Sequence, residues 1–385
     1  MKLAFVYDAI YPWVKGGAEK RIYEIGRRLA QEGHEVHVFG VKWWEGADII
    51  TNEGMVLHGV CRKMELYVQG RRSIYEPVIF SVKLLPHLTR GKFDIIDVSA
   101  FPYFSCFTAK FVSIVRRTPM IITWLEVWND YWYQYMGRMG FFGKIVEHLV
   151  SKLPSRSIAI SALTKMRLES IGVGGKNIII LPIGVDLEEI NIIPPSDLNS
   201  DIIFVGRLIK EKNVDMLIEA VAYLINELPH VNCQIIGDGP VKKKLEEMVI
   251  ENGLQDNVFF SGFMEYSKII ARMKSSKVLV LPSSREGFGI VVIEAYACGV
   301  PVITVRTRQN ASSELIEGTG FTVNPDSMEL CKAIRTLIND SGIHQKMSES
   351  ALIKAKEFNW DNIVKQLSCL YEETIMEERQ GAAGK

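Results

Sequence analysis

Short apolar runs alternate along the chain with longer segments of helical periodicity. The run at 2–7 leads into a glycine-containing loop, then into a segment at 18–32 with apolar residues at helical spacing, and then into a second apolar run at 35–40. Similar apolar runs, separated by helical segments, follow at 93–98, 120–123 and 157–161. Strands that alternate with helices in this way predict parallel sheets with helices on both faces.

This pattern is interrupted once and then starts again. At 191–200, Pro194-Pro195 and the polar residues that follow indicate a linker. An apolar run at 201–206 then opens a second series of alternating segments, and a final helix is expected over residues 360–378. The restart indicates two related α/β units.

We therefore expect an α/β protein with two Rossmann-like domains whose parallel sheets face each other across a cleft. The N-terminal domain is expected to span 1–190 and the C-terminal domain 191–359, with the helix at 360–378 packing back onto the first domain. Ligands of open parallel sheets bind at the carboxyl ends of the strands, so motifs in the loops after strands carry the most weight.

The composition is typical of a soluble globular protein of two domains, with 385 residues, 48% of them hydrophobic and 23% charged. The net charge of zero argues against a nucleic-acid partner. Residues 1–187 nevertheless contain 24 Lys+Arg against 17 Asp+Glu, a net charge of +7, which leaves −7 on the rest of the chain. This excess is either ordinary solvated charge or a basic face for anionic lipid or a phosphorylated acceptor.

Features that report on the compartment point to the cytoplasm. The first apolar run is short and is broken by Asp8, unlike a signal peptide, and no stretch of 18 apolar residues is present to span a membrane. The six cysteines form no CxxC pair, which is typical of a reducing compartment and argues against structural zinc. We expect a cytoplasmic protein, either free or held peripherally at the inner face of the membrane.

The strongest chemical signal is the segment EGFGIVVIEA. Its helical part is apolar except for Glu294, and a carboxylate in a buried helix needs a polar partner or a wet cleft. Glu286 lies eight positions earlier, in the loop before a helix expected to begin around Gly287. Gly287 and Gly289, on either side of Phe288, keep the first turn free of Cβ atoms, so that a phosphate can approach the helix amides. The alternative is a buried helix with one capped glutamate.

Two further loops follow expected strands. In FVGRLIKEKN, Arg207 comes directly after the strand at 201–206 and Lys212 lies just before the next helix. An Arg and a Lys at this spacing are common on surfaces, and it is their position after a strand of the second unit that gives the motif weight. In YPWVKGGAEKR, Gly16 and Gly17 end the loop after the first strand, and the alternative there is an ordinary turn before a helix.

Together these motifs resemble family 4 of the glycosyltransferases (glycosyl transferases group 1), a family of retaining enzymes with the type B fold of two Rossmann-like domains. The main match is EGFGxxxxEA, and GGAE, GDGP and FSGF are further matches. The resemblance implies that Glu286 contacts hydroxyls of a donor sugar and that Glu294 holds the ribose hydroxyls of its nucleotide. It also implies that Arg207 and Lys212 grip the donor pyrophosphate, and that Phe263 belongs to a loop against the nucleotide base.

The loop TWLEVWNDYW departs from this family, which often has a histidine where this chain has Leu125. Glu126 and Asp130 are candidate substitutes, and we count Glu126 among the substrate-binding residues. The aromatic residues of the segment either line an acceptor groove and stack on sugar faces or cover the core. They are Trp124, Trp128, Tyr131, Trp132, Tyr133 and Tyr135.

The resemblance implies a retaining hexosyltransferase that moves a sugar from a UDP- or GDP-sugar to a hydroxyl of a glycan or a lipid-linked acceptor. It implies no cofactor and no metal, because Arg207, Lys212 and helix amides offset the pyrophosphate charge. Contact with an anionic membrane would suit a lipid-linked acceptor. Two other functions stay open: a nucleotide-sugar epimerase of the same fold, and a non-catalytic nucleotide-sugar-binding partner, which is motivated by Leu125. No GxGxxG or GxxxxGK[ST] motif is present, which argues against dehydrogenases and P-loop ATPases.

Overall fold

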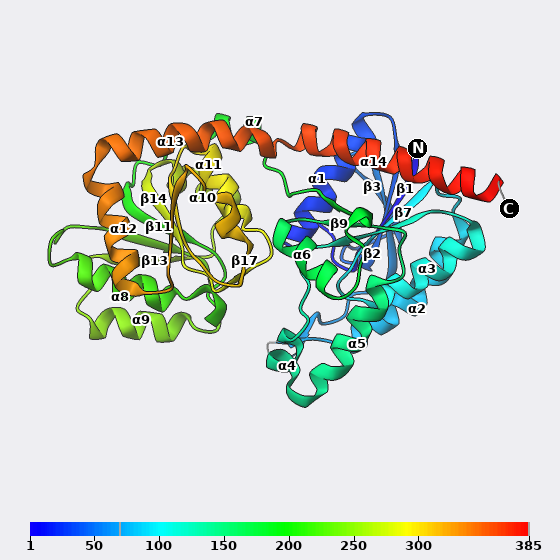
Figure 1. Cartoon of the computed structure of the whole chain (residues 1–385), viewed down its shortest axis with the longest axis horizontal. Helices are drawn as coiled ribbons and strands as arrows, with labels where there is room; N and C mark the ends of the chain where they lie inside the picture. The colour runs from blue at the N-terminus through cyan, green and yellow to red at the C-terminus, as the bar shows by residue number, and fades with distance from the viewer. Residues whose placement is uncertain (69–70, 384–385) are drawn as a thin grey trace. The chain divides into compact units, whose positions relative to one another are not determined.

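The computed structural model describes residues 1–68 and 71–383. The chain divides into two compact units, one formed by Met1–Ile183 with Trp360–Lys385 and the other by Gly184–Asn359. Each unit has its own mainly parallel sheet with helices packed on it (Figure 1), as the alternation of apolar runs and helical segments predicts.

The sheet of the first unit has eight strands in the order β10-β9-β8-β7-β1-β2-β4-β3. Neighbouring strands are parallel except for β3 and β4, which form an antiparallel hairpin at one edge. A separate short hairpin joins β5 (Tyr67–Val68) and β6 (Arg71–Arg72). The strands of the main sheet are β1 (Lys2–Val6), β2 (Glu35–Lys42), β3 (Ile49–Asn52), β4 (Met55–Arg62), β7 (Ile95–Ser99), β8 (Met120–Trp124), β9 (Arg156–Ala159) and β10 (Ile178–Ile180).

Helices pack on both faces of this sheet because alternate strand residues point to opposite sides. On β1, Ala4 and Val6 belong to the same buried cluster as Phe80 on α2, whereas the ring of Phe5 contacts Tyr371 on α14. The helices are α1 (Gly17–Gln31), α2 (Tyr75–Arg90), α3 (Phe104–Arg116), α4 (Tyr131–Met136), α5 (Gly140–Ser151), α6 (Ala162–Ser170) and α14 (Trp360–Ala383).

Helix α14 is part of the first unit although it follows the second unit in sequence. The hydroxyl of Tyr371 donates a hydrogen bond to the buried carboxylate of Asp97 on β7, and Thr123 Oγ1 donates to the other oxygen at 2.8 Å. At the surface, Arg156 forms an ion pair with Glu373 at 3.2 Å. A buried carboxylate is tolerated only with such partners, so these bonds specify where the helix packs.

The sheet of the second unit has six parallel strands in the order β13-β12-β11-β14-β16-β18. These strands are β11 (Ser200–Val205), β12 (Cys233–Ile236), β13 (Val258–Gly262), β14 (Ser276–Leu281), β16 (Val302–Val305) and β18 (Gly320–Val323). The short strands β15 (Arg285–Glu286) and β17 (Gln309–Asn310) pair separately. The helices are α7 (Leu187–Ile192), α8 (Val214–Leu224), α9 (Lys242–Glu251), α10 (Tyr266–Lys274), α11 (Ile290–Ala297), α12 (Ser327–Asn339) and α13 (Ser341–Ala355).

Two boundaries differ from the sequence-based expectation. The units divide after Ile183 and not after residue 190, because Lys274 Nζ donates to the carbonyls of Ile190 (2.6 Å) and Ile193 (2.7 Å) and holds α7 on the second unit. Helix α11 begins at Ile290 and not around Gly287, because Gly289 has a φ of +97°, in the left-handed region, and caps the helix. Over the residues described, no helix is both long and apolar enough to cross a membrane.

Candidate functional site

The strands β11, β12 and β13 end together at glycines. The amide of Gly206 donates to the carbonyl of Ile236 at 3.0 Å, and the amide of Gly237 donates to the carbonyl of Gly262 at 2.9 Å. Gly237 has a φ of +144°, and a Cβ there would lie 1.9 Å from the carbonyl oxygen of Gly206. Only glycine fits this close approach, which leaves the carboxyl edge of the sheet open to a ligand.

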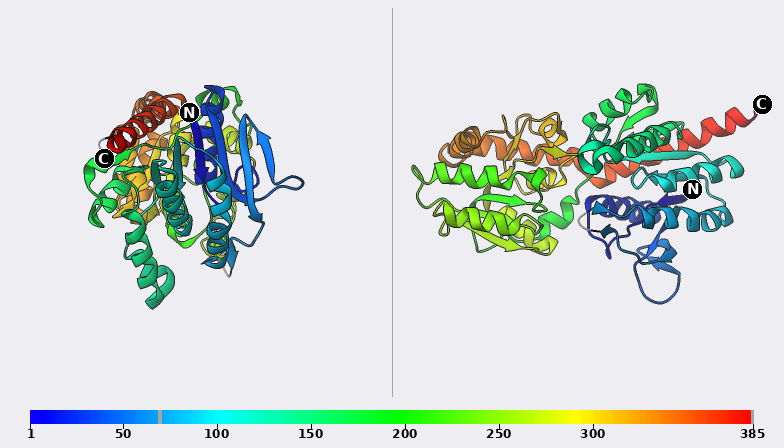
Figure 2. Two further views of the ribbon diagram at one scale, coloured as in Figure 1. Left: turned by 90° about the vertical axis from the view of Figure 1, so that its right-hand side faces the viewer. Right: turned by 90° about the horizontal axis from the view of Figure 1, so that it is seen from below.

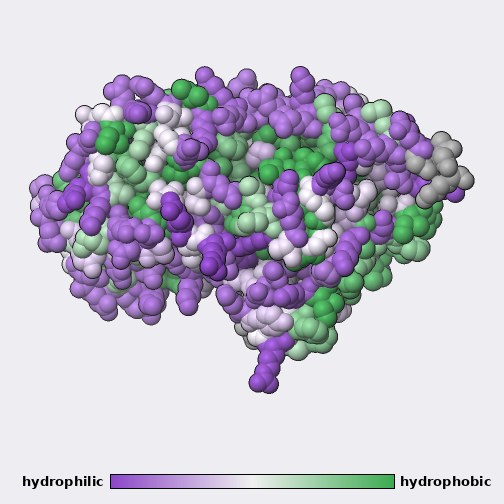
Figure 3. Space-filling model, viewed as in Figure 1, coloured by the Kyte–Doolittle hydropathy of each residue, from purple (hydrophilic) through white to green (hydrophobic). Residues whose placement is uncertain are grey.

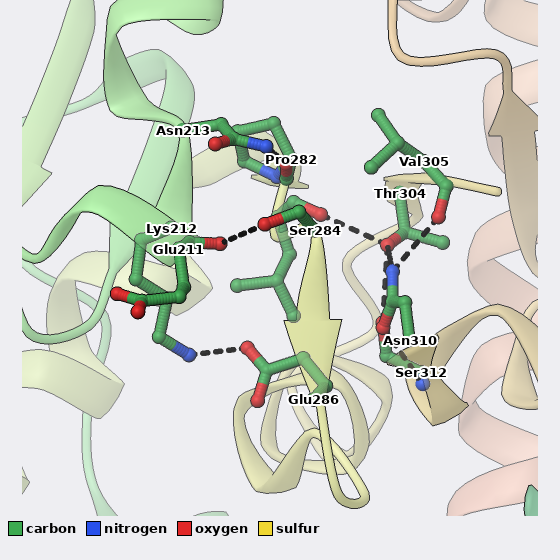
Figure 4. Close-up of polar contacts among 11 residues, drawn as sticks. Glu211, Lys212, Asn213, Pro282, Ser284, Glu286, Thr304, Val305, Asn310 and Ser312 are labelled. Atoms are coloured by element: carbon green, nitrogen blue, oxygen red, sulfur yellow. Dashed lines mark hydrogen bonds and ion pairs between the residues drawn. The ribbon is translucent and has the colours of Figure 1, made fainter. Parts of the chain in front are cut away.

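The loop after β11 and the loop after β14 are tied to each other at this edge. The backbone amide of Ser284 donates to the carbonyl of Glu211 at 2.9 Å, and Asn213 Nδ2 donates to the carbonyl of Pro282 at 3.1 Å. Asn213 has a φ of +46° and occupies the N-cap position of α8. These bonds hold the two loops in one arrangement (Figure 4).

This arrangement brings Lys212 and Glu286 together. Lys212 Nζ forms a hydrogen-bonded ion pair with Glu286 Oε1 (Figure 4), and the two side chains are 18% and 13% exposed. Arg207 lies exposed on the loop that follows β11 at the same edge of the sheet. A mostly buried carboxylate beside a mostly buried cation offers hydrogen-bond acceptors and positive charge at one place.

A buried polar network supports the strand that carries Glu286. Glu286 on β15 is in register with Asn310 on β17. Asn310 Nδ2 donates to Thr304 Oγ1 at 3.1 Å and to the carbonyl of Val305 at 2.8 Å, while its Oδ1 accepts the amide of Ser312 at 3.0 Å. Both polar ends of the Asn310 side chain are satisfied, so the strand that carries Glu286 is held in a defined position.

Glu294 on α11 has the polar partner that its apolar surroundings require. The hydroxyl of Tyr266, the first residue of α10, donates a hydrogen bond to its carboxylate. Burial raises the pKa of Tyr266, and the charge of Glu294 raises that pKa further. The hydroxyl therefore keeps its proton and remains a donor to Glu294.

The glycine-rich turn before α11 differs from the expected one. Gly287 precedes the helix, and Gly289 caps it without being part of the first turn; a Cβ on Gly289 would lie 2.8 Å from the Cβ of Ser312. The ring of Phe288 is buried and packs against Phe358, with 5.9 Å between ring centroids. Only the backbone of Phe288 is therefore placed to meet a ligand. Phe263, in contrast, is 71% exposed.

The remaining predicted residues belong to the first unit. Gly16 is exposed and caps α1 in an extended conformation, and Gly17 is the first residue of that helix. The side chain of Glu19 is buried in the first helical turn with its carboxylate against Gly16, where an added Cβ would lie 2.4 Å from Glu19 Oε2. Glu126, after β8, accepts a hydrogen bond from Trp128 Nε1 at 3.0 Å.

Glu147 organises the loop that contains Leu125 and Glu126, and sequence reasoning missed it. Its buried carboxylate accepts the backbone amides of Trp128 and Asn129, both at 2.7 Å, and the hydroxyl of Tyr103 at 2.6 Å. Burial raises the pKa of Glu147, and these three donors partly offset the rise. Its helical face also carries Lys144 and Ser151, so the local pattern gave no signal that this carboxylate is buried.

The aromatic residues of this segment mostly cover the core, which was one of the two expected interpretations. Trp124 and Trp132 are buried in the core, and Trp128 and Tyr135 are partly buried against it. Tyr133 is 42% exposed. The stacking surface available to a ligand is therefore smaller than the number of aromatic rings indicates.

A second missed feature is a buried charged cluster at the carboxyl end of β1. Arg72 Nη2 donates to Asp8 Oδ2 and lies 3.6 Å from Glu76 Oε2. Asp8 is fully buried and Glu76 is 1% exposed. Burial, with the nearby charge of Asp8, raises the pKa of Glu76 to about 8. Asp8 lies 64 positions before Arg72, so no local motif reveals the cluster.

Comparison with known proteins identifies the family. The model of the "Glycosyl transferases group 1" family matches residues 188–354, and the model of "Glycosyltransferase Family 4" matches residues 15–189. Alpha-D-kanosaminyltransferase of Streptomyces kanamyceticus is 32% identical over 176 residues, which are 45% of this chain and 45% of that protein. The chain thus spans about half the length of this relative.

Two other similarities extend over almost the whole chain. A phosphatidylinositol N-acetylglucosaminyltransferase component of Arabidopsis thaliana is 22% identical over 394 aligned residues, which cover 97% of this chain and 82% of that protein. The crystal structure of Alr3699/HepE of Anabaena in complex with UDP and glucose superposes with a TM-score of 0.75 and 21% identity, covering 97% of this chain and 100% of that one. The two matching family models and the two parallel-sheet domains together show that this chain belongs to the family 4 (group 1) glycosyltransferases of the type B fold.

Proposed function

We propose that the protein is a retaining hexosyltransferase that moves a sugar from a UDP- or GDP-sugar to an acceptor hydroxyl without a metal ion. The observation that carries the proposal is the ion pair of Lys212 and Glu286 at the carboxyl edge of the second sheet. A cation next to a carboxylate is suited to a ligand in which a diphosphate adjoins sugar hydroxyls. The complex of the related Anabaena protein with UDP and glucose supports a nucleotide-sugar donor.

In the proposed reaction, the bond between the anomeric carbon of the sugar and the diphosphate oxygen breaks. A bond from the same carbon to the acceptor oxygen forms on the same face, and the acceptor's hydroxyl proton passes to the departing diphosphate. Arg207 and Lys212 stabilise the negative charge that builds up on the leaving group, and this charge is greater in the transition state than in the bound donor. No separate protein base is required, which is consistent with Leu125 in place of a histidine.

Two carboxylates position the donor in this proposal. Glu286 accepts hydrogen bonds from hydroxyls of the sugar, and Glu294 accepts them from the ribose. The Glu294 carboxylate already accepts a hydrogen bond from the hydroxyl of Tyr266. It has further lone pairs that can accept hydrogen bonds from the two vicinal hydroxyls of a ribose. The amides around Gly287 and Gly289 face the phosphates, and Phe263 lies against the base.

The acceptor is a glycan or a lipid-linked molecule in this proposal. Gly16 and Gly17 of the first unit bind substrate near the reacting phosphate and sugar, and Glu126 is a further substrate-binding residue. Two observations support a lipid-linked acceptor held at the inner membrane face. Residues 1–187 carry the excess of positive charge, and a relative that aligns over 97% of this chain is named for transfer to phosphatidylinositol. Anionic lipid surfaces attract basic protein surfaces.

A screen of nucleotide sugars by thermal shift tests the donor, since a ligand of the native state raises the melting temperature. Transfer is then assayed with the best donor and a panel of glycan and lipid-linked acceptors. The proposal predicts stabilisation by a UDP- or GDP-sugar and transfer with retention of the anomeric configuration. Failure of every nucleotide sugar to stabilise the protein would contradict it.

A second candidate function is a non-catalytic nucleotide-sugar-binding partner, and Leu125 is the observation that favours it. Calorimetry distinguishes it from the enzyme, because a binding partner would take up the donor without transfer or hydrolysis over the whole acceptor panel. A new sugar formed from the donor alone would instead indicate an epimerase.

A further inference from the structure

Three helices of the first unit present large apolar side chains to solvent. Helices α2, α3 and α5 lie along one side of this unit (Figures 1 and 2), and the surface there is hydrophobic (Figure 3). Each helix exposes four large apolar residues: Tyr75, Val78, Val82 and Leu85 on α2; Phe107, Phe111, Ile114 and Val115 on α3; and Phe141, Phe142, Ile145 and Leu149 on α5. We call the surface formed by these twelve residues the α2–α3–α5 face.

These helices also bury apolar residues on their inner side. Phe80 and Leu84 on α2, Cys106 and Ala109 on α3, and Val150 on α5 all belong to the core of the first unit. The outer apolar residues are therefore not needed to attach the helices to the sheet. An apolar patch of this extent in water is unusual for a surface with no binding partner.

Two of the three helices pack side by side, and the third is linked to them by a buried hydrogen bond. Helices α2 and α3 pack side by side, with Ser81 Oγ 2.8 Å from Thr108 Oγ1. The hydroxyl of Tyr103, at the N-cap of α3, donates to Glu147 on α5 at 2.6 Å. Helices α2 and α3 thus present their apolar residues on adjoining surfaces, and α5 is tied to the start of α3.

The charges that the three helices themselves expose have one sign, and the neighbouring Asp130 forms an ion pair with Lys144 of α5 at 2.6 Å. The only acidic residues within the three helices are Glu76 and Glu147, and each is 1% exposed. Lys83, Arg90 and Arg116 are exposed on or at the ends of the same helices. The charged groups that these three helices offer to solvent are therefore cationic, and they lie among apolar side chains.

This combination indicates which partner covers the face. The headgroup region of an anionic bilayer supplies negative charge, and the acyl chains beneath it accept apolar side chains. A second copy of the chain would place cations opposite cations, because a two-fold interface brings the same patch together. Charge complementarity therefore favours the membrane.

We propose that the α2–α3–α5 face docks on an anionic lipid bilayer, with Phe111 and Phe142 among the side chains that enter the acyl boundary and Lys83 and Arg90 among those that meet the phosphates. Docking would hold the first unit at the surface that carries a lipid-linked acceptor. That consequence rests on the proposed function, whereas the docking itself does not.

Vesicle flotation of the full chain tests the docking. The vesicles contain phosphatidylcholine alone or phosphatidylcholine with phosphatidylglycerol, each at low and at physiological salt. We expect flotation with the anionic vesicles, weakened but not abolished by salt, because screening acts on the charges and not on the apolar contacts. A wild-type protein that stays at the bottom with anionic vesicles at low salt would overturn the proposal.

Matched variants locate the contact. Phe111→Ser with Phe142→Ser should lower the partition onto anionic vesicles roughly tenfold or more. Lys83→Glu with Arg90→Glu should lower it by a similar factor at low salt and remove most of its salt dependence. The control Ile250→Ser with Ile353→Ser alters equally exposed apolar residues of the second unit and should float like the wild type. Equal flotation of all variants would contradict the assignment of the face.

Two further readouts separate the possible outcomes. Thermal shift with a nucleotide sugar should be unchanged in the face variants, so loss of flotation with normal donor stabilisation supports docking independently of the proposed chemistry. If no nucleotide sugar stabilises the wild type although the protein still floats with vesicles, that result would count against the proposed function and not against docking. Light scattering that shows a wild-type dimer, converted to a monomer by Phe111→Ser with Phe142→Ser, would assign the face to a second copy and overturn the proposal.

Discussion

Lys212 Nζ donates a charged hydrogen bond to Glu286 Oε1, joining the loop after β11 to the loop after β14. Both side chains are mostly buried, so each charge is the other's principal compensation. A diphosphate bound beside Lys212 would supply negative charge and so replace part of the compensation that Glu286 gives to Lys212. In the proposed function, Lys212 then turns to the phosphate and Glu286 to the sugar hydroxyls.

Replacing Lys212 with Ala should abolish transfer and weaken the binding of both the nucleoside diphosphate and the nucleotide sugar. Loss of a charged hydrogen bond to phosphate costs about 1.5–3 kcal/mol, which corresponds to an affinity loss of about 10- to 150-fold. Calorimetric titration with UDP and GDP measures this loss of affinity. Lys210→Ala, in the same turn but exposed, is the matched control and should bind like the wild type. Wild-type affinity in Lys212→Ala would rule out a phosphate contact.

Transfer should not depend on a divalent cation. Arg207, Lys212 and the backbone amides before α11 are proposed to offset the diphosphate charge, a task that other transferases assign to a metal. Initial transfer rates measured after dialysis against EDTA, with and without added Mg²⁺ or Mn²⁺, should agree within about twofold. A loss of activity in EDTA that is restored by added Mn²⁺ would show that Arg207, Lys212 and the backbone amides do not suffice to offset the diphosphate charge.

The buried pair of Asp8 and Glu76 predicts a pH dependence of stability. The pKa of Glu76 is raised in the folded protein from an ordinary 4.5 to about 8, first by burial and then by Asp8. Between these values the folded chain holds a proton that the unfolded chain has released, so this residue's contribution to stability falls as pH rises from 4.5 to about 8. Glu76→Gln removes the titration and should gain stability relative to the wild type over that range.

Urea unfolding of both proteins at several pH values measures this difference in the free energy of unfolding. Glu65→Gln, at an exposed position, serves as the control and should show no such trend. A difference between Glu76→Gln and the wild type that stays constant with pH would mean that Glu76 is already ionised in the fold.

Glu147→Gln should destabilise the first unit by about 1–3 kcal/mol, because an amide cannot accept three hydrogen bonds as a carboxylate does and one buried donor loses its partner. The loop containing Leu125 and Glu126 should become mobile at the same time. Hydrogen exchange of the amides of Trp128 and Asn129 reports on the loop, and urea unfolding reports on stability. Glu169→Gln, which is exposed, is the control; unchanged protection of both amides in Glu147→Gln would contradict the role assigned to Glu147.

Local patterns predicted most of the fold. The alternation of apolar runs with helical segments predicted two parallel α/β units, and the sheets have that form. The start of α11 could not be found in this way, because the sequence does not reveal that Gly289 adopts a left-handed conformation at the N-cap. The antiparallel edge strand β3 was also not predicted, since the segment 49–52 is short and mixed in polarity.

Residues of the candidate site could be predicted where they lie in loops that follow expected strands. Lys212 and Glu286 lie in such loops, and the structure pairs them. Tyr266, Glu147 and the Asp8–Arg72–Glu76 cluster were not found, because each acts through a partner on another element. Aromatic spacing alone could not distinguish a binding groove from core packing, and the burial of Trp124 and Trp132 decides that question for those two rings.

In the proposed function, Glu286 binds the sugar of a nucleotide donor whose diphosphate lies beside Lys212. Calorimetric comparison of a nucleoside diphosphate with its nucleotide sugar, on the wild type and on Glu286→Gln, isolates this contact. We expect the wild type to bind the sugar form more tightly. The variant should lose this preference while binding the diphosphate at least as well, since a negative charge beside Lys212 is gone. A variant that keeps the full preference for the nucleotide sugar would contradict the role proposed for Glu286.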